Sequence, residues 1–107
     1  MVFSEKIKYN TISKYYDGVS LSVSNNLLVP ILESGMVVFV GEKENYGSTV
    51  IVEGVDGVDV WYGNLENINV QMYDFVEKGS ALASTSSDKL YLVFKKDGEN
   101  IDYEKYL

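Results

Sequence analysis

The stretch that decides the fold is residues 58–82, Val58-Asp-Val-Trp-Tyr-Gly-Asn-Leu-Glu-Asn-Ile-Asn-Val-Gln-Met-Tyr-Asp-Phe-Val-Glu-Lys-Gly-Ser-Ala-Leu82. Its first residues alternate in polarity, and the side expected to face a core consists of Val58, Val60 and Tyr62. Asp59 and Trp61 fall on the other side. A period of two is typical of a β-strand with one buried face. Gly63 ends this strand, and Gly79 supplies a turn further on.

Upstream of this stretch, residues 48–63 predict a β-hairpin. Asp56-Gly57 lies between two valines and matches a two-residue type I′ turn. Folding at that turn would place Val52 opposite Trp61. It would also place Ile51 opposite Tyr62, so that β-branched and aromatic side chains pair across the strands.

Further short strands are expected on both sides of the hairpin, at residues 19–23, 27–32, 36–41 and 90–94. Pro30 fits an edge or a strand start better than a central ladder. Residues 3–16 have loosely spaced apolar side chains, which predict either a short helix or an extended lead-in. We therefore expect a lead-in segment at 1–15 and one mainly β domain at 16–107. It should be a compact antiparallel β-sheet domain.

The composition bounds the class of protein. The chain has 107 residues, of which 46% are hydrophobic, and this is enough for one domain with one core. No apolar run approaches the roughly 18 residues of a membrane span. Residues 1–5 lack the basic start and apolar middle of a signal peptide. The sequence as given is therefore expected to be soluble, with any anchor outside it.

The charge and the missing residue types exclude several functions. Nine Lys and Arg against sixteen Asp and Glu give a net charge of −7, which disfavours nucleic acid and anionic membrane surfaces as partners. There is no Cys and no His. Their absence excludes disulfides, Ser-His-Asp and Cys-His catalysis, and the commonest zinc ligands.

Other chemistries lack the necessary spacing. Glu42, Glu44 and Glu53 are typical of a solvated loop and hairpin face, because nothing in the sequence places two of them across a glycosidase cleft. No acidic run has calcium-loop spacing, and the isolated glycines form no phosphate-binding motif. The sequence predicts no cofactor.

Two motifs in the central stretch resemble the LytM-type zinc peptidases of the M23 family. Tyr62-Gly-Asn-Leu65 is similar to the Tyr-Gly-His-Leu strand end of that family. Residues 73–79, Tyr-Asp-Phe-Val-Glu-Lys-Gly, are similar to its Gly-Asp-x-Val-x-x-Gly segment. The resemblance continues from about residue 16 to 107 through segments 29–37, 47–52 and 101–107. It implies a barrel-sandwich-like β fold.

The resemblance also implies which positions would carry chemistry in an active member. Such an enzyme would bind zinc through a His-x-x-x-Asp pair and the second His of a His-x-His pair, with further histidines assisting the bound water. Matching these motifs puts Tyr16 and Ser20 at the first pair and Lys89 and Tyr91 at the second, while Asn64 replaces the His of Tyr-Gly-His-Leu. Neutral Ser, Tyr and Asn are poor zinc ligands, and a protonated Lys repels the ion. We expect no zinc and no peptidase activity.

Residues 61–79 are most similar to a non-catalytic sporulation branch of the family. That resemblance implies an extracytoplasmic domain, tethered to a membrane in the full-length protein, that binds other proteins and restrains a membrane-embedded protease complex. The candidate partner surface consists of the former-site positions Tyr16, Ser20, Asn64, Lys89 and Tyr91 together with the neighbouring aromatics Trp61 and Tyr62. Aromatic side chains on strands are more often core or cross-strand packing, and this is the alternative interpretation of Trp61, Tyr62 and Tyr91.

Other functions stay open at this point. The domain could activate a cell-wall amidase or bind peptidoglycan. It could also be an adaptor of the biotinyl or lipoyl type, although such a domain needs a lysine at a hairpin tip and Asp56-Gly57 has none. A residual hydrolase would require relocated metal ligands.

Overall fold

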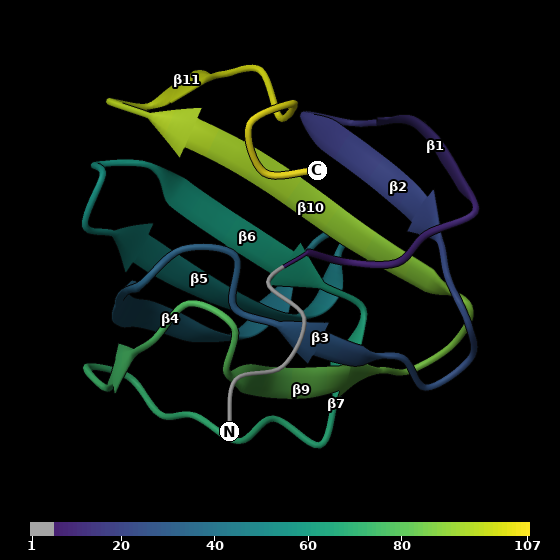
Figure 1. Ribbon diagram of the computed structural model, residues 1–107, viewed down its shortest axis with the longest axis horizontal. Coiled ribbons are helices and arrows are strands. Elements are labelled where there is room, and N and C mark those ends of the chain that lie inside the picture. Colours follow the sequence, from purple (N-terminus) through teal and green to yellow (C-terminus); the bar gives the residue numbers. More distant parts are fainter. Residues whose placement is uncertain (1–5) are drawn as a thin grey trace.

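The structure is a computed structural model that describes residues 6–107 (Figure 1). These residues form eleven β-strands: β1 (Thr11–Tyr15), β2 (Gly18–Ser22), β3 (Leu28–Pro30), β4 (Gly35–Lys43), β5 (Gly47–Gly54), β6 (Asp59–Gly63), β7 (Leu65–Glu66), β8 (Phe75–Val76), β9 (Ala81–Thr85), β10 (Lys89–Lys96) and β11 (Glu99–Asn100). The described part of the chain contains no helix, and so none that could cross a membrane. The predicted mainly β antiparallel fold is confirmed.

The strands form two antiparallel sheets. The large sheet has eight strands in the order β1-β2-β10-β6-β5-β4-β8, with β11 paired to β10. The small sheet has the order β3-β9-β7. Figure 1 shows β10, β6, β5 and β4 running side by side, with β3 and β9 of the small sheet in front of them. One core cluster joins both sheets, because it contains residues of each, among them Val37, Val50, Val29 and Leu82.

The alternation read from the sequence sets which side of β6 faces this core. Val58, Val60 and Tyr62 are all at most 4% exposed, as expected. Asp59 and Trp61 lie on the opposite face and are half-buried. The strands predicted at residues 19–23, 36–41 and 90–94 are also present, as β2, β4 and β10. Burial of one face of each strand is the main source of their stability.

The predicted register of the hairpin was wrong by one residue. Val52 lies opposite Val60, and Ile51 lies opposite Trp61. The connection is a three-residue loop, because the Gly54 N–H donates to the Val58 carbonyl at 2.9 Å. A type I′ turn needs a positive φ at both central residues, whereas only Gly57 has one here (φ 85°). The Asp56 carboxylate instead accepts the Val58 N–H at 3.0 Å, which stabilises the longer loop.

Two other local predictions have different outcomes. Pro30 ends β3, an edge strand with a register shift between Val29 and Pro30, as its missing N–H requires. The helix considered for residues 3–16 is wrong where it is described, because Thr11–Tyr15 pairs with β2 and Ile12 packs on the core. Phe3 lies outside the described residues. The domain boundary at residue 16 stays a prediction.

The C-terminal tail is held to the hairpin tip. Tyr106 is 5% exposed, stacks on Phe94 with ring centroids 5.0 Å apart, and donates its hydroxyl to Asp56 Oδ2 at 2.6 Å. The ammonium of Lys105 lies 3.9 Å from the same carboxylate oxygen. Burial alone would raise the pKa of Asp56, but the bonds from Tyr106 and Val58 outweigh it and the pKa is lowered.

This lowered pKa predicts a pH dependence of stability. A carboxyl whose pKa is lower in the folded state stabilises the fold above its usual pKa, near 3.8, and this contribution is lost as the pH falls through the folded value. Asp56→Asn should therefore reduce the free energy of unfolding at neutral pH by about 1–2 kcal/mol. Its stability should also fall less on acidification, as measured by denaturant titrations across this pH range.

Asp59→Asn is the control for this measurement. Burial, and then the neighbouring Glu53, raise the pKa of Asp59, so ionised Asp59 costs stability at neutral pH. Asp59→Asn should therefore raise the free energy of unfolding at neutral pH. In the parent protein, protonation of Asp59 on acidification should raise this free energy, and the variant should lack that increase. Equal pH profiles for the two variants would contradict the assignment of Asp56.

Candidate functional site

The strand register brings together most of the positions singled out in the sequence. Ser20 of β2 lies opposite Tyr91 of β10, and Tyr91 lies opposite Gly63 at the end of β6. Asn64 follows Gly63 directly. Three positions matched to the former site, from three distant parts of the chain, therefore lie close together at the end of β6.

The Asn64 side chain is committed to hydrogen bonds within the domain. Its amide nitrogen donates to Ser87 Oγ at 3.0 Å and to the Lys89 carbonyl at 2.8 Å, and its amide oxygen accepts the Ser86 hydroxyl at 2.5 Å. Its backbone has φ 65°, a left-handed conformation that Asn tolerates better than most residues. Asn64 thus fixes the loop before β10, and both polar atoms of its amide are already engaged.

Aromatic rings cover the same face. We call Tyr15, Tyr16, Tyr46, Trp61 and Tyr91 the aromatic face, because each of their rings lies within 6.3 Å, centroid to centroid, of at least one other member. Tyr15 and Tyr91 stack with centroids 4.2 Å apart and planes at 6°. Tyr16 is 58% exposed and has φ 50°, so its ring is the most accessible member.

The aromatic face covers a second, smaller apolar layer. Ile51 and Val93 lie on either side of Trp61 in the register of β5, β6 and β10. Both are at most 8% exposed although they are not part of the core cluster between the two sheets. The rings of the aromatic face therefore lie on this outer side of the sheet, with Trp61 between Ile51 and Val93.

Two lysines flank Trp61. The ammonium of Lys43 lies 5.2 Å from the ring centroid, and that of Lys95 lies 5.0 Å from it. Lys95 also pairs with Asp17 at 3.7 Å. These cation–π contacts make the surroundings of Trp61 both apolar and positively charged, in a protein whose net charge is −7.

The remaining predicted residues are placed differently. Tyr62 is 0% exposed, and its hydroxyl oxygen accepts the Leu32 N–H at 3.0 Å. Its assignment to a partner surface was wrong, because its position in the alternation of β6 points it into the core. Lys89 is exposed and lies opposite Ser22, so it stands at the margin of the aromatic face.

Sequence reasoning missed Tyr15 and Tyr46. Tyr15 was placed in the lead-in, and the loop containing Tyr46 was considered only as charged and solvated. In the fold Tyr46 is 6% exposed, its carbonyl accepts the Asn64 N–H at 2.6 Å, and its hydroxyl oxygen accepts the Asp17 N–H at 3.2 Å. The local signals are Asn45 and Gly47, whose φ values of 73° and 72° permit the turn that contains Tyr46.

The hydroxyls of Tyr15 and Tyr46 are not suited to acid–base chemistry. Loss of water around Tyr15 raises its pKa, and the neighbouring Tyr91 raises it further. Burial likewise raises the pKa of Tyr46. Both groups stay protonated at neutral pH, and so they act as neutral hydrogen-bonding and packing groups.

Two further observations bear on the chemistry available. Among residues 6–107, no three His, Cys, Asp or Glu side chains are grouped as metal ligands would be.

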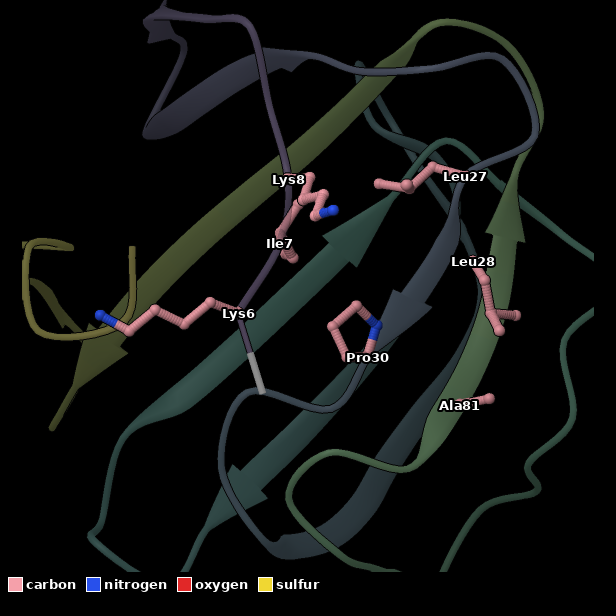
Figure 2. Close-up of a pocket in the computed structure, with 7 residues that line it drawn as sticks. All are labelled: Lys6, Ile7, Lys8, Leu27, Leu28, Pro30 and Ala81. Carbon is pink, nitrogen blue, oxygen red and sulfur yellow. The ribbon is translucent and has the colours of Figure 1, made fainter. Parts of the chain in front are cut away.

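A hollow elsewhere on the molecule is lined by Lys6, Ile7, Lys8, Leu27, Leu28, Pro30 and Ala81 (Figure 2). Its side chains come from the N-terminal segment and from around β3 and β9, and apart from the two lysines they are apolar.

Comparison with known proteins identifies relatives of this fold and sequence. The model of peptidase family M23 matches residues 14–103. The chain is 33% identical over 87 residues to Stage IV sporulation protein FA of Bacillus subtilis (strain 168), a match that covers 78% of this chain and 33% of that protein. The chain thus spans about a third of the length of this relative.

Solved structures share the fold at lower identity. Helicobacter pylori Csd3 superposes with a TM-score of 0.82 at 21% identity, covering 100% of this chain and 33% of that one. The catalytic domain of the peptidase lysostaphin from Staphylococcus simulans gives 0.72 at 20% identity, covering 84% and 77%. The SpoIIQ–SpoIIIAH pore-forming complex gives 0.71 at 20% identity, covering 94% and 70%. The resemblance seen in the sequence is confirmed, and this chain belongs to peptidase family M23.

Proposed function

We propose that this domain is a non-catalytic, protein-binding member of the family that regulates a membrane-embedded protease. The observation that carries this proposal is the state of the former-site positions. The side-chain amide of Asn64 is hydrogen-bonded to Ser86, Ser87 and Lys89, and the Tyr91 ring is stacked on the Tyr15 ring. These two side chains, at positions that the motif match assigns to the former site, are here fixed by contacts within the domain.

The donor set does not fit zinc. Structural and hydrolytic zinc sites use thiolate, imidazole or carboxylate ligands. Tyr16, Ser20, Asn64, Lys89 and Tyr91 provide neutral hydroxyls, an amide and an ammonium. These side chains do not provide the ligands that a hydrolytic zinc site needs.

The aromatic face has the composition of a protein interface. Tyr and Trp are enriched in the buried centres of such interfaces, because they offer large apolar area at low entropic cost. Tyr16 is accessible, and Lys43 and Lys95 place positive charge beside Trp61. One structural neighbour, the SpoIIQ–SpoIIIAH complex, is an assembly of two proteins, which supports a protein partner.

The relationship to Stage IV sporulation protein FA supports the rest of the proposal. The domain would lie outside the cytoplasm, tethered by another part of a longer chain. The adaptor alternative loses support, because the hairpin tip at residues 55–57 has no lysine and its Asp56 is bound to Tyr106.

The partner surface can be tested by site-specific cross-linking of the full-length protein in its own cells. A photoreactive phenylalanine analogue replaces Tyr16 in one variant and Leu28 in a matched control. Both side chains are about half-exposed, at 58% and 46%, but Leu28 lies in the small sheet. We expect a membrane protease among the products cross-linked from position 16 and not from position 28.

Two outcomes would overturn the proposal. One is equal cross-linking from both positions. The other is stoichiometric zinc in the purified protein, shown by elemental analysis, together with zinc-dependent cleavage of peptidoglycan. Cross-linking from position 16 to an amidase or to peptidoglycan in place of a protease would replace the proposed partner by one of the alternatives.

A further inference from the structure

A second surface lies at the β8 edge of the large sheet. The register places Phe75 opposite Met36, Met36 opposite Glu53, and Glu53 opposite Asp59. Directly paired residues project from the same face of a sheet. This row therefore carries two apolar side chains followed by two carboxylates, across β8, β4, β5 and β6.

The edge exposes an unusual amount of apolar side chain. We call Met36, Met72, Tyr73 and Phe75 the edge patch; they are 44%, 42%, 72% and 63% exposed. Four of the seven large hydrophobic residues that are exposed in the described part of the chain belong to this short region. Clustering of exposed apolar side chains, unlike single ones, marks an interaction site.

The backbone at this edge is strained and yet held in place. Tyr73 has φ 75°, a left-handed conformation that is costly for a bulky aromatic residue. Its N–H donates to the Val37 carbonyl at 2.7 Å, and the Val37 N–H donates to the Asp74 carbonyl at 2.9 Å. These two bonds hold the backbone around the exposed Tyr73 to Val37, the residue after Met36 in β4.

The two carboxylates beside the patch lack a counterion. Glu53 and Asp59 are directly opposite each other, an arrangement that destabilises a sheet. Lys95 is the cross-strand partner of Asp59 on β10, but its ammonium pairs with Asp17 and lies over Trp61. No ion pair within residues 6–107 neutralises either carboxylate.

We propose that the edge patch, with Glu53 and Asp59, binds a cationic amphipathic segment of a partner protein. Apolar side chains of that segment would cover Met36, Tyr73 and Phe75, while its Lys or Arg residues would pair with the two carboxylates. A second copy of the chain is a poorer partner for this surface than a cationic segment. Two such edges would bring four unpaired carboxylates together, and each chain already has a net charge of −7. Glu53 and Asp59 project from the same face of the large sheet as Trp61, so this surface adjoins the aromatic face. The proposal does not depend on the function proposed for the aromatic face.

The experiment uses three synthetic peptides of equal length as probes. One alternates Leu and Lys, one alternates Leu and Glu, and one alternates Ser and Lys. Binding to the protein is measured by fluorescence anisotropy at low and high salt. We expect the Leu–Lys peptide to bind at least about tenfold more tightly than either of the others, and to weaken as salt is raised.

Matched variants locate the binding. Two variants change the proposed surface: the double variant Glu53→Gln with Asp59→Asn, and the single variant Phe75→Ser. Each should bind the Leu–Lys peptide about tenfold more weakly than the parent protein. The controls remove the same charge or the same apolar character elsewhere: Glu99→Gln with Glu104→Gln, and Leu28→Ser. They should bind like the parent. Because Glu53→Gln with Asp59→Asn relieves repulsion, its melting temperature should not fall, so that weaker binding cannot come from unfolding.

The proposal is overturned if the Leu–Glu peptide binds as well as the Leu–Lys peptide, which would show only apolar adhesion. It is also overturned if the edge variants and the control variants bind the Leu–Lys peptide alike. Loss of binding in the edge variants alone supports it, whatever the cross-linking from position 16 shows.

Discussion

Gly18→Ala is expected to destabilise the domain by about 3 kcal/mol or more, enough to leave much of a small domain unfolded. A methyl group at this position would lie 1.9 Å from the Leu92 carbonyl oxygen and 2.9 Å from Val93 Cγ2. The first contact is with the backbone of the neighbouring strand, which cannot rotate away. The clash can be relieved only by separating β2 from β10, so circular dichroism should show a melting temperature lower by roughly 10 °C or more.

Gly41→Ala is the matched control. Gly41 is also a strand residue of the large sheet, but the three atoms nearest to an added methyl group all belong to the Phe39 ring, the closest at 3.0 Å. That ring can rotate, so the cost should stay below about 1 kcal/mol. If the two variants were equally stable, the close approach of β2 to β10 at Gly18 would be refuted.

Tyr62→Ala is expected to cost about 3–5 kcal/mol, the range for removing a buried aromatic side chain. Tyr62 is the largest of the completely buried side chains, so the space it leaves cannot be filled by neighbours. Tyr62→Phe keeps the ring but leaves the buried Leu32 N–H without its acceptor, which should cost about 1–3 kcal/mol. Denaturant titrations of both variants separate packing from hydrogen bonding.

Tyr15→Phe makes the same chemical change at an exposed bond. The Tyr15 hydroxyl donates to the Asn45 carbonyl at 2.5 Å, where water can replace it. The stability of this variant should stay within about 0.5 kcal/mol of the parent. A loss of stability as large as that of Tyr62→Phe would mean that burial does not distinguish the two hydroxyls.

Because Tyr62 variants are expected to be destabilised, any loss of partner binding in such a variant should first be checked against unfolding.

The secondary structure was predictable because it is a local consequence of polarity. Alternation identified the buried faces of β2 and β6, and an apolar run identified β4. The hairpin register was not predictable from the Asp56-Gly57 pair. The choice between a two-residue and a three-residue loop was decided by Gly54 pairing with Val58 and by Tyr106, which is distant in sequence and binds Asp56.

The candidate site was predictable in part. The motif positions Ser20, Asn64 and Tyr91 lie close together in the fold. Their role as a former site stays a prediction. Tyr15 and Tyr46 could not be assigned to the site from the sequence. Their rings reach it only because β1 pairs with β2 and because the loop between β4 and β5 turns over the sheet.

By itself, the sequence determined the class of fold, the faces of the strands and the residue types at the former-site positions, because alternation, turn residues and the lack of His and Cys are local properties. Only the tertiary structure decided which side chains meet: Tyr62 enters the core, five rings cover the sheet, and Glu53 faces Asp59. These contacts depend on strand order and register. Both are fixed by the simultaneous burial of residues far apart in the chain, which no single segment specifies.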